Sequence, residues 1–392
     1  MSDDTLQVPL GDPAFFAGDP HPELAELRRR CPISWQSDGE FWAVTSLRDI
    51  QTVGKDPATF CSGQGVLMSD RGRDIAAEDS LLYLDPPRHE QYRKLVNRAF
   101  TPRRVATLEP RIRQLTLELL DTIDPRSPVD LVDSLCAPLP MLVIAELLGL
   151  PDEDRESFRR WSDAIMEAAT DLNEENAVQA MELIAYFDVQ LDQRTDAPTE
   201  DLLSGLLMAE VDGASLTRAE VQGFCMTLMV AGNETTRSLV SGGMVELARH
   251  PDQRARLVAD PELIPVAVEE MLRWVTPIMA MARTTTRSVS LGDAELGAGE
   301  FVVLAYGAAN RDEEVFGNDA GVFDISRNPN PHVSFGFGEH FCIGASLARL
   351  EARILLEEVL ARWPDYQLAG EVVRAPSTLF RQITRAPVLF AR

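Results

Sequence analysis

The sequence has little cysteine, almost no lysine and no long apolar run. Its five cysteines are widely spaced and odd in number, which excludes the framework of a small disulfide-linked domain and suits a reducing cytoplasm. No segment reaches the roughly 18 consecutive apolar residues of a membrane-spanning helix. The nearest, residues 137–150, is interrupted by Pro138, Pro140 and Glu146. The first residues are acidic and lack the basic and apolar parts of a secretory signal. We therefore expect a soluble, cytoplasmic protein.

Basic residues are also outnumbered by acidic ones, which gives a formal net charge of −25. Such a balance argues against binding to nucleic acids or anionic membranes, both of which select basic proteins. One stretch reverses the sign, with Arg88, Arg93, Lys94, Arg98, Arg103, Arg104, Arg111 and Arg113 against only Glu90 and Glu109. A solvated helix face is one explanation. Because 35 of the 37 basic residues are arginine, genomic base composition can account for part of the excess. The other explanation is a surface that binds negatively charged groups or an acidic partner protein.

The 392 residues contain no linker, low-complexity tract or internal repeat, which favours a single domain over residues 1–392. The longest predicted helix begins near Thr217, which forms a capping-box pattern with Glu220, and ends at about Arg249. Apolar residues at helical spacing predict further helices over residues 105–123, 138–148, 154–168, 176–194, 262–274 and 345–363. β-Structure is predicted over residues 33–46, 282–304 and, as a terminal hairpin, 380–390. The fold class is mainly α with a minor β portion.

Residues 335–344, Phe-Gly-Phe-Gly-Glu-His-Phe-Cys-Ile-Gly, place Cys342 in a glycine-rich loop directly before a predicted helix. The free N–H groups of a helix N-terminus stabilise a thiolate, the form of cysteine that binds metals. Gly336 and Gly338 permit backbone angles that other residues avoid, and Gly344 leaves room for a flat ligand. The remaining cysteines are better explained as small buried apolar residues: Cys31, Cys61, Cys136 and Cys225. Zinc is the weaker alternative at Cys342, because a zinc site needs about four protein ligands and only His332 and His340 lie nearby.

The pattern Phe-Gly-x-Gly-x-His-x-Cys-x-Gly resembles, at every fixed position, the haem-binding loop of the cytochrome P450 superfamily. The resemblance extends over residues 35–390, with the motifs of the superfamily in their usual order. It implies the cytochrome P450 fold, with a long central helix over a haem b group (iron protoporphyrin IX) whose iron is bound by Cys342. It also implies that Phe335, Gly336 and Gly344 contact the haem.

Residues 231–236, Ala-Gly-Asn-Glu-Thr-Thr, lie in the middle of the longest predicted helix. The plainer explanation of this helix-weakening segment is a kink, at which the Thr235 hydroxyl bonds to a carbonyl one turn earlier. The segment also resembles the oxygen-activation motif of the superfamily. That resemblance implies that Thr235 and Glu234 are catalytic groups that deliver protons, and that Ala231 contacts the haem.

Two further sets of residues match the superfamily. Glu270 and Arg273 stand three apart, as in many helix-surface pairs, but together with Arg327 they resemble a buried structural network that lies upstream of the haem loop. His89 and Arg93 lie one helical turn apart and face the same way. With Arg283 and His340 they match positions that bind the haem propionates, for which the donor fork of arginine is well suited.

The resemblance implies a bacterial haem-thiolate monooxygenase that hydroxylates an unactivated C–H bond with O2. Because the resemblance accounts for essentially the whole sequence, we expect no fused flavin domain, and we expect electrons from NAD(P)H through a reductase and a separate ferredoxin-like protein that docks near the Arg88–Arg113 region. We also expect a monomer. A peroxygenase and a non-catalytic haem-binding protein are alternatives of another class; the first would lack the pair Glu234 and Thr235, and the second would not require Thr235.

The positions that form the substrate pocket in the superfamily are mostly apolar here, which favours a bulky hydrophobic substrate, although any core has a similar composition. They include Leu67, Met68, Leu82, Leu228, Ile278, Met279 and Phe380. The forms of residues 231–237 and 275–279 look most like those of actinobacterial members that oxidise steroids, terpenoids or branched lipids. Tailoring of a polyketide, a macrolide-like compound or another secondary metabolite is the alternative.

Overall fold

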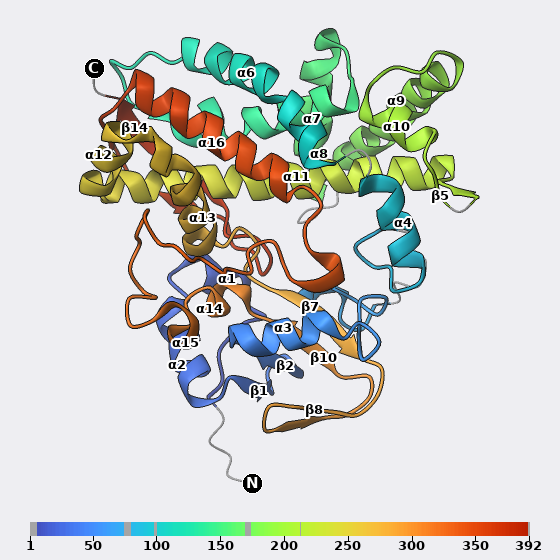
Figure 1. The fold of residues 1–392 in the computed structure, drawn as a ribbon, viewed down its shortest axis with the longest axis vertical. Coiled ribbons are helices and arrows are strands. Elements are labelled where there is room, and N and C mark those ends of the chain that lie inside the picture. The colour runs from blue at the N-terminus through green and yellow to red at the C-terminus, as the bar shows by residue number, and fades with distance from the viewer. Residues whose placement is uncertain (1–5, 74–79, 98–99, 169–173, 212, 391–392) are drawn as a thin grey trace.

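The structure, a computed structural model, describes residues 6–73, 80–97, 100–168, 174–211 and 213–390. Most helices gather in one part of the molecule, and the main sheet lies in the other part beside the N-terminal helices (Figure 1). The fold is therefore mainly α with a minor β portion, as predicted. None of the helices in the described part of the chain is both long and apolar enough to cross a membrane.

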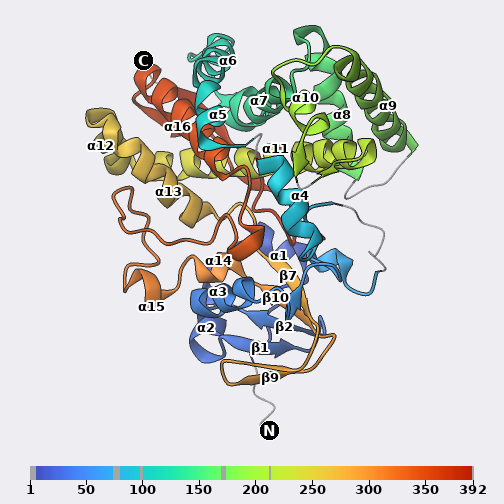
Figure 2. The ribbon, with the colours of Figure 1, turned by 45° about the vertical axis from the view of Figure 1, so that its right-hand side comes forward.

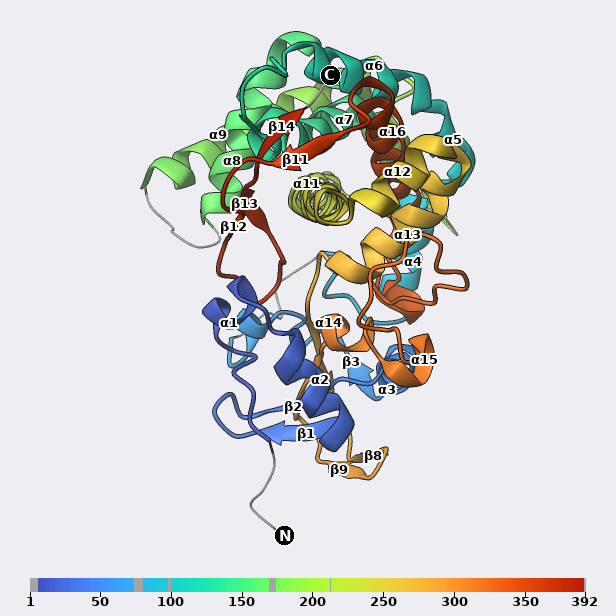
Figure 3. The same cartoon turned by 90° about the vertical axis from the view of Figure 1, so that its left-hand side faces the viewer.

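Helix α11 (Arg218–Arg249) is the axis of the helical part. It begins where predicted, because Thr217 and Glu220 form both hydrogen bonds of a capping box. Its 32 residues span about 48 Å at about 1.5 Å per residue. Seen end-on, α11 lies in the middle of the helical part, with other helices of that part around it (Figure 3). Most of its residues beyond Leu239 are buried, which explains how so weakly amphipathic a helix is stable.

Five predicted ranges, 138–148, 154–168, 176–194, 262–274 and 345–363, are confirmed to within two residues at each end, whereas several helices of the structure lie in no predicted range. Helices other than α11 occur throughout the described chain. They are α1 (Pro13–Ala17), α2 (His21–Arg30), α3 (Leu47–Lys55), α4 (Arg88–Asn97), α5 (Pro102–Thr107), α6 (Glu109–Asp121), α7 (Pro138–Leu148), α8 (Arg155–Ala168), α9 (Glu174–Asp196), α10 (Leu202–Leu207), α12 (Pro251–Ala259), α13 (Ile264–Val275), α14 (Tyr306–Ala309), α15 (Glu313–Phe316) and α16 (Ala345–Arg362). The predicted helix over residues 105–123 was wrong, because it is divided at Leu108 into α5 and α6. Pro110 has no N–H to donate to the carbonyl of Ala106, so one continuous helix cannot form.

The main sheet has the strand order β1-β2-β10-β7-β3, with β1 (Ile33–Gln36), β2 (Phe41–Val44), β10 (Phe301–Leu304), β7 (Met281–Thr285) and β3 (Phe60–Cys61). The predicted hairpin is confirmed, since β1 and β2 pair antiparallel. Two small pairs lie outside this sheet, β5 (Glu210–Val211) with β6 (Ala214–Ser215) and β8 (Val289–Leu291) with β9 (Ala294–Leu296). The sheet matters for the site because β7 carries Arg283.

The predicted terminal hairpin was wrong. Strand β13 (Ile383–Arg385) pairs with β12 (Val373–Arg374), whereas β14 (Pro387–Phe390) pairs with β11 (Tyr366–Leu368) and β4 (Val129–Asp130). A single residue, Ala386, separates β13 from β14, which is shorter than the two-residue loop of the tightest common hairpins. The two strands therefore enter different sheets.

A buried ion network joins α13 to the irregular segment that leads to the cysteine loop. Glu270 and Arg273 are both fully buried, with 2.6 Å between Glu270 Oε1 and Arg273 Nη2. Arg327 Nε lies 3.4 Å from Glu270 Oε2. Arg273 also donates to the carbonyls of Asn310 and Ala320, at 2.9 and 2.8 Å. Removing one partner of such a network strands a buried charge, which typically costs about 3–5 kcal/mol.

Candidate active site

The loop before α16 holds Cys342 by its backbone. Gly336 and Gly338 have φ angles of +71° and +78°, which side-chain-bearing residues rarely adopt. The Cys342 N–H donates to the Phe335 carbonyl at 2.8 Å and closes the loop. The Gly344 N–H in turn hydrogen-bonds Cys342. Cys342 keeps exposed surface at the N-terminus of α16, although the surrounding protein keeps most water away from its sulfur.

Gly338 is also required by a close approach of two backbones. A Cβ atom at Gly338 would lie 1.8 Å from the carbonyl oxygen of Gly54 in α3. Gly54 in turn leaves only 2.9 Å between its own added Cβ and the Phe337 carbonyl oxygen. Lys55 covers the Phe337 ring, with Nζ 5.5 Å from the ring centroid. Helix α3 therefore serves as the support against which the cysteine loop is seated.

Cations surround the sulfur on the side of α4 and α16. Burial raises the pKa of the Cys342 thiol, whereas the Gly344 N–H and the charges of Arg93 and Arg349 lower it. Arg93 reaches the loop directly and donates to the Phe341 carbonyl. A metal cation at the sulfur would act in the same direction as these charges and hold the thiolate form.

Arg349 and Glu269 form a contact that the sequence analysis missed. Arg349 binds Glu269 through two hydrogen bonds of 2.6 and 2.8 Å, and its guanidinium lies 4.5 Å from the centroid of the Phe335 ring. His332 adds a third contact to Glu269 at 3.1 Å. Burial opposes ionisation, yet the hydrogen bonds from Arg349 and His332 lower the pKa of Glu269 to about 2. The arrangement fixes Phe335, whose carbonyl closes the cysteine loop.

Two histidines stack beside the loop. The rings of His89, from α4, and His340 lie with their centroids 4.1 Å apart. Burial lowers the pKa of His89 to about 4, and Arg93 adds to this; burial lowers that of His340 to about 2, and Arg283 adds to this. His340 Nε2 contacts Ser62 Oγ at 3.1 Å. Both ring nitrogens of His89 are buried, and within the described ranges they have no hydrogen-bond partner.

These side chains fit a haem with its two propionates. Two arginines and the neutral, unmatched imidazole of His89 call for carboxylate oxygens, which accept but do not donate. His89, Glu339 and His340 also offer three metal-ligand atoms within 4.8 Å of one another. The positive charges of Arg93 and Arg283 oppose a cation there, because both lower the pKa of the histidines. The structure thus brings together the four predicted propionate residues and places Cys342 beside them.

The middle of α11 remains helical through residues 231–236. The Thr235 hydroxyl donates to the Ala231 carbonyl at 2.5 Å, which is the bond one turn earlier that the plainer explanation predicts. Ala231 is exposed and Thr235 half-buried, so the two share the more open face of the helix. Close packing explains why residue 232 is a glycine, since a Cβ atom at Gly232 would lie 3.0 Å from Ile144 Cδ1 of α7.

Glu234 lies about 100° around the helix from Thr235 and is almost fully buried, with 1% exposure. It accepts a hydrogen bond from Gln382 Nε2 at 2.7 Å and pairs with Arg237 Nη1 at 3.2 Å. Gln382 was missed by the sequence analysis, and no local pattern points to a partner 148 residues away. The carboxylate is therefore tied to the turn before β13.

The predicted substrate-pocket residues divide into two groups. Ile278 and Phe380 form a β-bridge, and Met279 N–H donates to the Leu379 carbonyl at 2.8 Å, so these segments lie side by side. Met279 itself packs into the core, where a Cβ at Gly307 would lie 2.2 Å from its Cε. The others are partly or largely buried in the core clusters around this region: Leu67, Met68, Leu82 and Leu228.

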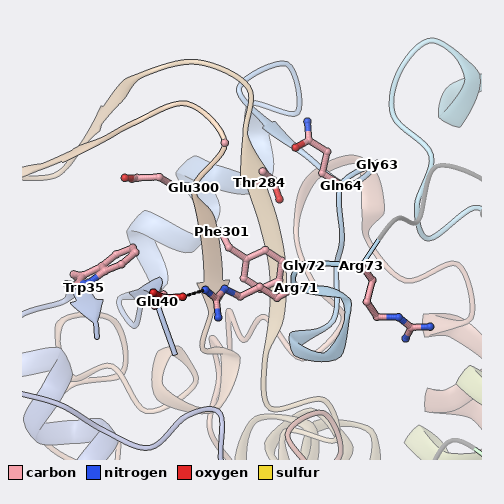
Figure 4. A pocket seen from close by; sticks show the side chains of 11 residues that line it. Trp35, Glu40, Gly63, Gln64, Arg71, Gly72, Arg73, Thr284, Glu300 and Phe301 are labelled. Carbon is pink, nitrogen blue, oxygen red and sulfur yellow. Dashed lines mark hydrogen bonds and ion pairs between the residues drawn. The ribbon is translucent and has the colours of Figure 1, made fainter. Parts of the chain in front are cut away.

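Two cavities open on the sheet side of the molecule. The larger, of about 770 Å³, is lined by aromatic and charged residues that include Trp35, Arg71, Arg73, Glu300 and Phe301 (Figure 4). The predicted pocket residues do not line it, and its polar character does not suit an apolar substrate. The second, of about 650 Å³, is lined in part by Met68 and Thr378. It lies beside the turn that carries Phe380.

The basic stretch is less positive than its sequence suggests. Arg113 is bound by Glu109, Glu357 and Glu358, and Arg111 by Glu146 and Asp152. These acids come mostly from other elements, which a count along the chain omits. Arg88 pairs with Glu220, and Arg98 lies outside the described residues. Lys94 and Arg103 are exposed on α4 and α5, which face the viewer in Figure 2.

A thiol presented at a helix N-terminus, a cluster suited to two propionates and a long helix in the centre of the fold define a haem-thiolate protein. The Cytochrome P450 family model matches residues 30–364. The chain belongs to the cytochrome P450 family.

Three relatives illustrate this. The methyl-branched lipid omega-hydroxylase of Mycobacterium tuberculosis is 36% identical, over 98% of this chain and 95% of the relative. The vitamin D(3) 25-hydroxylase of Pseudonocardia autotrophica is 38% identical, over 95% of this chain and 94% of the relative. The crystal structure of CYP109E1 from Bacillus megaterium in complex with testosterone superposes with a TM-score of 0.87 at 35% identity, covering 96% of this chain and 100% of that one.

The close approach at Gly338 predicts a strong effect of one methyl group. Gly338→Ala adds a backbone clash to an unfavourable φ angle, and we expect the free energy of unfolding to fall by about 3 kcal/mol or more and the haem content to drop. Gly336→Ala is the matched control. It meets the same φ penalty of about 1–2 kcal/mol, but its nearest neighbour would be 3.7 Å away. The ratio of haem to protein absorbance and urea unfolding measure both effects, and equal losses in the two variants would contradict this account.

Proposed function

We propose that this monooxygenase hydroxylates an unactivated C–H bond of a bulky hydrophobic substrate, a steroid, terpenoid or lipid. The observation that carries the proposal is that the predicted pocket residues Ile278 and Phe380 meet in a β-bridge, while Ile278 and Leu82 pack against the same apolar cluster. Relatives named for a methyl-branched lipid and for vitamin D(3), and a neighbouring structure with bound testosterone, support the same class of substrate. Such ligands bind mainly by burying apolar surface.

When haem is bound, it supplies the activation of O2. Cys342 holds the metal as a thiolate, and the Gly344 N–H hydrogen-bonds the same sulfur. Arg93 and Arg283 neutralise the propionates, and His89 with His340 completes their hydrogen bonds. Phe335, Gly336, Gly344 and Ala231 are the further positions that we assign to haem contact.

Proton delivery is assigned to Thr235 and Glu234. The Thr235 hydroxyl donates to the Ala231 carbonyl in the structure, and rotation about its side chain frees it to donate toward the open face of α11. Glu234 is held by Gln382 and Arg237, so it acts as a proton source only after these bonds loosen.

Electrons reach a protein of this family from a redox partner. We assign this role to a ferredoxin-like protein, reduced by an NAD(P)H-dependent reductase, that docks on the face where the cysteine loop meets the surface. Phe341 is 40% exposed there, close to Arg93, and exposed Lys94 and Arg103 extend the positive charge. Charge steering of this kind weakens as ionic strength rises. We place the protein in the cytoplasm as a monomer, where its five free thiols stay reduced.

An optical titration of the ferric protein tests the class of substrate. Displacement of water from the iron shifts the Soret band, so a panel of sterols, terpenoids, fatty acids and macrolides reports binding directly. We expect a saturable shift with a steroid, terpenoid or lipid. In Phe380→Ala the affinity for that ligand should fall by about tenfold or more, because the substitution removes about 3 kcal/mol or more of apolar contact. Leu117→Ala, at an exposed position on α6, is the control. A shift with macrolides alone would reject the proposed substrate class.

Replacement of the threonine hydroxyl tests proton delivery. Thr235→Ala should lower the amount of product formed per O2 consumed by about tenfold or more, because positioned proton transfer contributes about 10²–10⁴ in rate. Thr235→Ser keeps the hydroxyl and should retain most of the coupling. Oxygen uptake and product are measured in the same reaction. Coupling that is unchanged in Thr235→Ala would remove this residue from the mechanism.

A further inference from the structure

A cluster of arginines lies on the other side of the turn that carries Phe380. It is formed by Arg311 after α14, Arg374 in β12 and Arg381 directly after Phe380, with His21 at the start of α2. All three arginines are among the positive charges that lower the pKa of His21. Figure 3 shows the connection from β12 to β13 extending toward the N-terminal helices. Charges from segments that are distant in sequence thus act on one imidazole, and hydrogen bonds to the Trp274 and Pro277 carbonyls hold Arg311 and Arg381 at the same short segment.

Several nitrogen atoms of this cluster are buried and unmatched. Across the described ranges, Arg311 Nε, Arg381 Nη1 and both ring nitrogens of His21 are buried without a hydrogen-bond partner. Arg311 is nevertheless held in place, since its guanidinium stacks on Trp274 at 3.6 Å from the ring centroid and donates to the Trp274 carbonyl at 3.3 Å. Leaving such donors unpaired costs about 1–3 kcal/mol each, and more for charged groups.

The nearby carboxylates do not balance the charge. Of the described acids, Asp19 and Glu246 are those that raise the pKa of arginines in the cluster. Glu246 already binds Arg249 at 2.8 Å, and Asp19 Oδ1 accepts the backbone N–H of His21 at 3.3 Å. Burial, followed by repulsion from neighbouring arginines, lowers the pKa of Arg311 to about 9 and that of Arg381 to about 10. Four arginines, Arg249 included, therefore face two carboxylates.

We propose that His21, Arg311, Arg374 and Arg381 form a binding site for one tetrahedral oxyanion of the phosphate or sulfate type. The donor fork of arginine matches two oxygens of such an anion, whereas a halide would meet only one N–H direction of each fork. The anion supplies acceptors for the buried N–H groups and offsets the excess charge. The backbone N–H of Arg381 donates to the Pro277 carbonyl at 3.0 Å, and Phe380 forms a β-bridge with Ile278. An anion bound to the Arg381 side chain therefore also fixes the turn beside the predicted substrate pocket.

Titration calorimetry of the holoprotein with inorganic phosphate tests the proposal. The buffer is zwitterionic, and sodium chloride keeps the ionic strength constant. We expect one saturable site per chain in the unmodified protein. Arg374→Gln and Arg381→Gln should each weaken binding by about tenfold or more, because each removes charge-assisted hydrogen bonds. Arg385→Gln changes the same charge at an exposed position of β13 and should leave the affinity unchanged.

The thiolate carbonyl spectrum of each variant confirms that the haem site is intact. If Arg381→Gln does not take up haem, Arg381→Lys, which keeps the charge but not the fork, replaces it and should also weaken binding. The proposal is overturned if the unmodified protein shows no saturable binding of phosphate. It is equally overturned if the cluster variants bind phosphate as tightly as Arg385→Gln does.

Discussion

The hydrogen bond from the Cys342 N–H to the Phe335 carbonyl is the contact on which the site depends, because it closes the loop that presents the sulfur. The loop can close only because Gly336 and Gly338 adopt positive φ angles and because Gly338 lies against the backbone of α3. Around it, the Gly344 N–H and two arginines favour the thiolate. One ten-residue segment thus supplies the thiolate ligand for a metal. The elements that pack on this segment supply the charges that favour the thiolate and the contacts that hold the loop in place.

The rest of the fold holds this loop from two sides. Behind it, the buried pair Glu270 and Arg273 ties α13 to the chain that runs into the loop, and Arg349 with Glu269 fixes the Phe335 ring. Above it, α11 crosses the helical part with its open face at residues 231 and 235. Helices and the main sheet therefore carry or support the groups that the proposed chemistry uses.

Local patterns in the sequence predicted most of this. The cysteine loop, the capped start of α11 and the hairpin β1–β2 are each specified by residues close together in the chain, and the structure contains all three. Long-range partners could not be predicted in the same way. Gln382 on Glu234, the acids that neutralise Arg111 and Arg113, and the pairing of β13 with β12 depend on how distant segments meet. Pro110 indicates a division of the helix near Leu108, but the helical spacing of apolar residues on either side favours one continuous helix.

The carbon monoxide spectrum of the reduced protein tests the central claim, which is that Cys342 binds the haem iron as a thiolate. The unmodified protein should show the red-shifted Soret band of thiolate ligation. Cys342→Ser should lose that band, because a serine oxygen cannot replace the thiolate donor. Cys31→Ser, at a half-buried cysteine in the N-terminal part of the chain, should keep it. A thiolate-type spectrum that survives in Cys342→Ser, or that disappears in Cys31→Ser, would contradict the account.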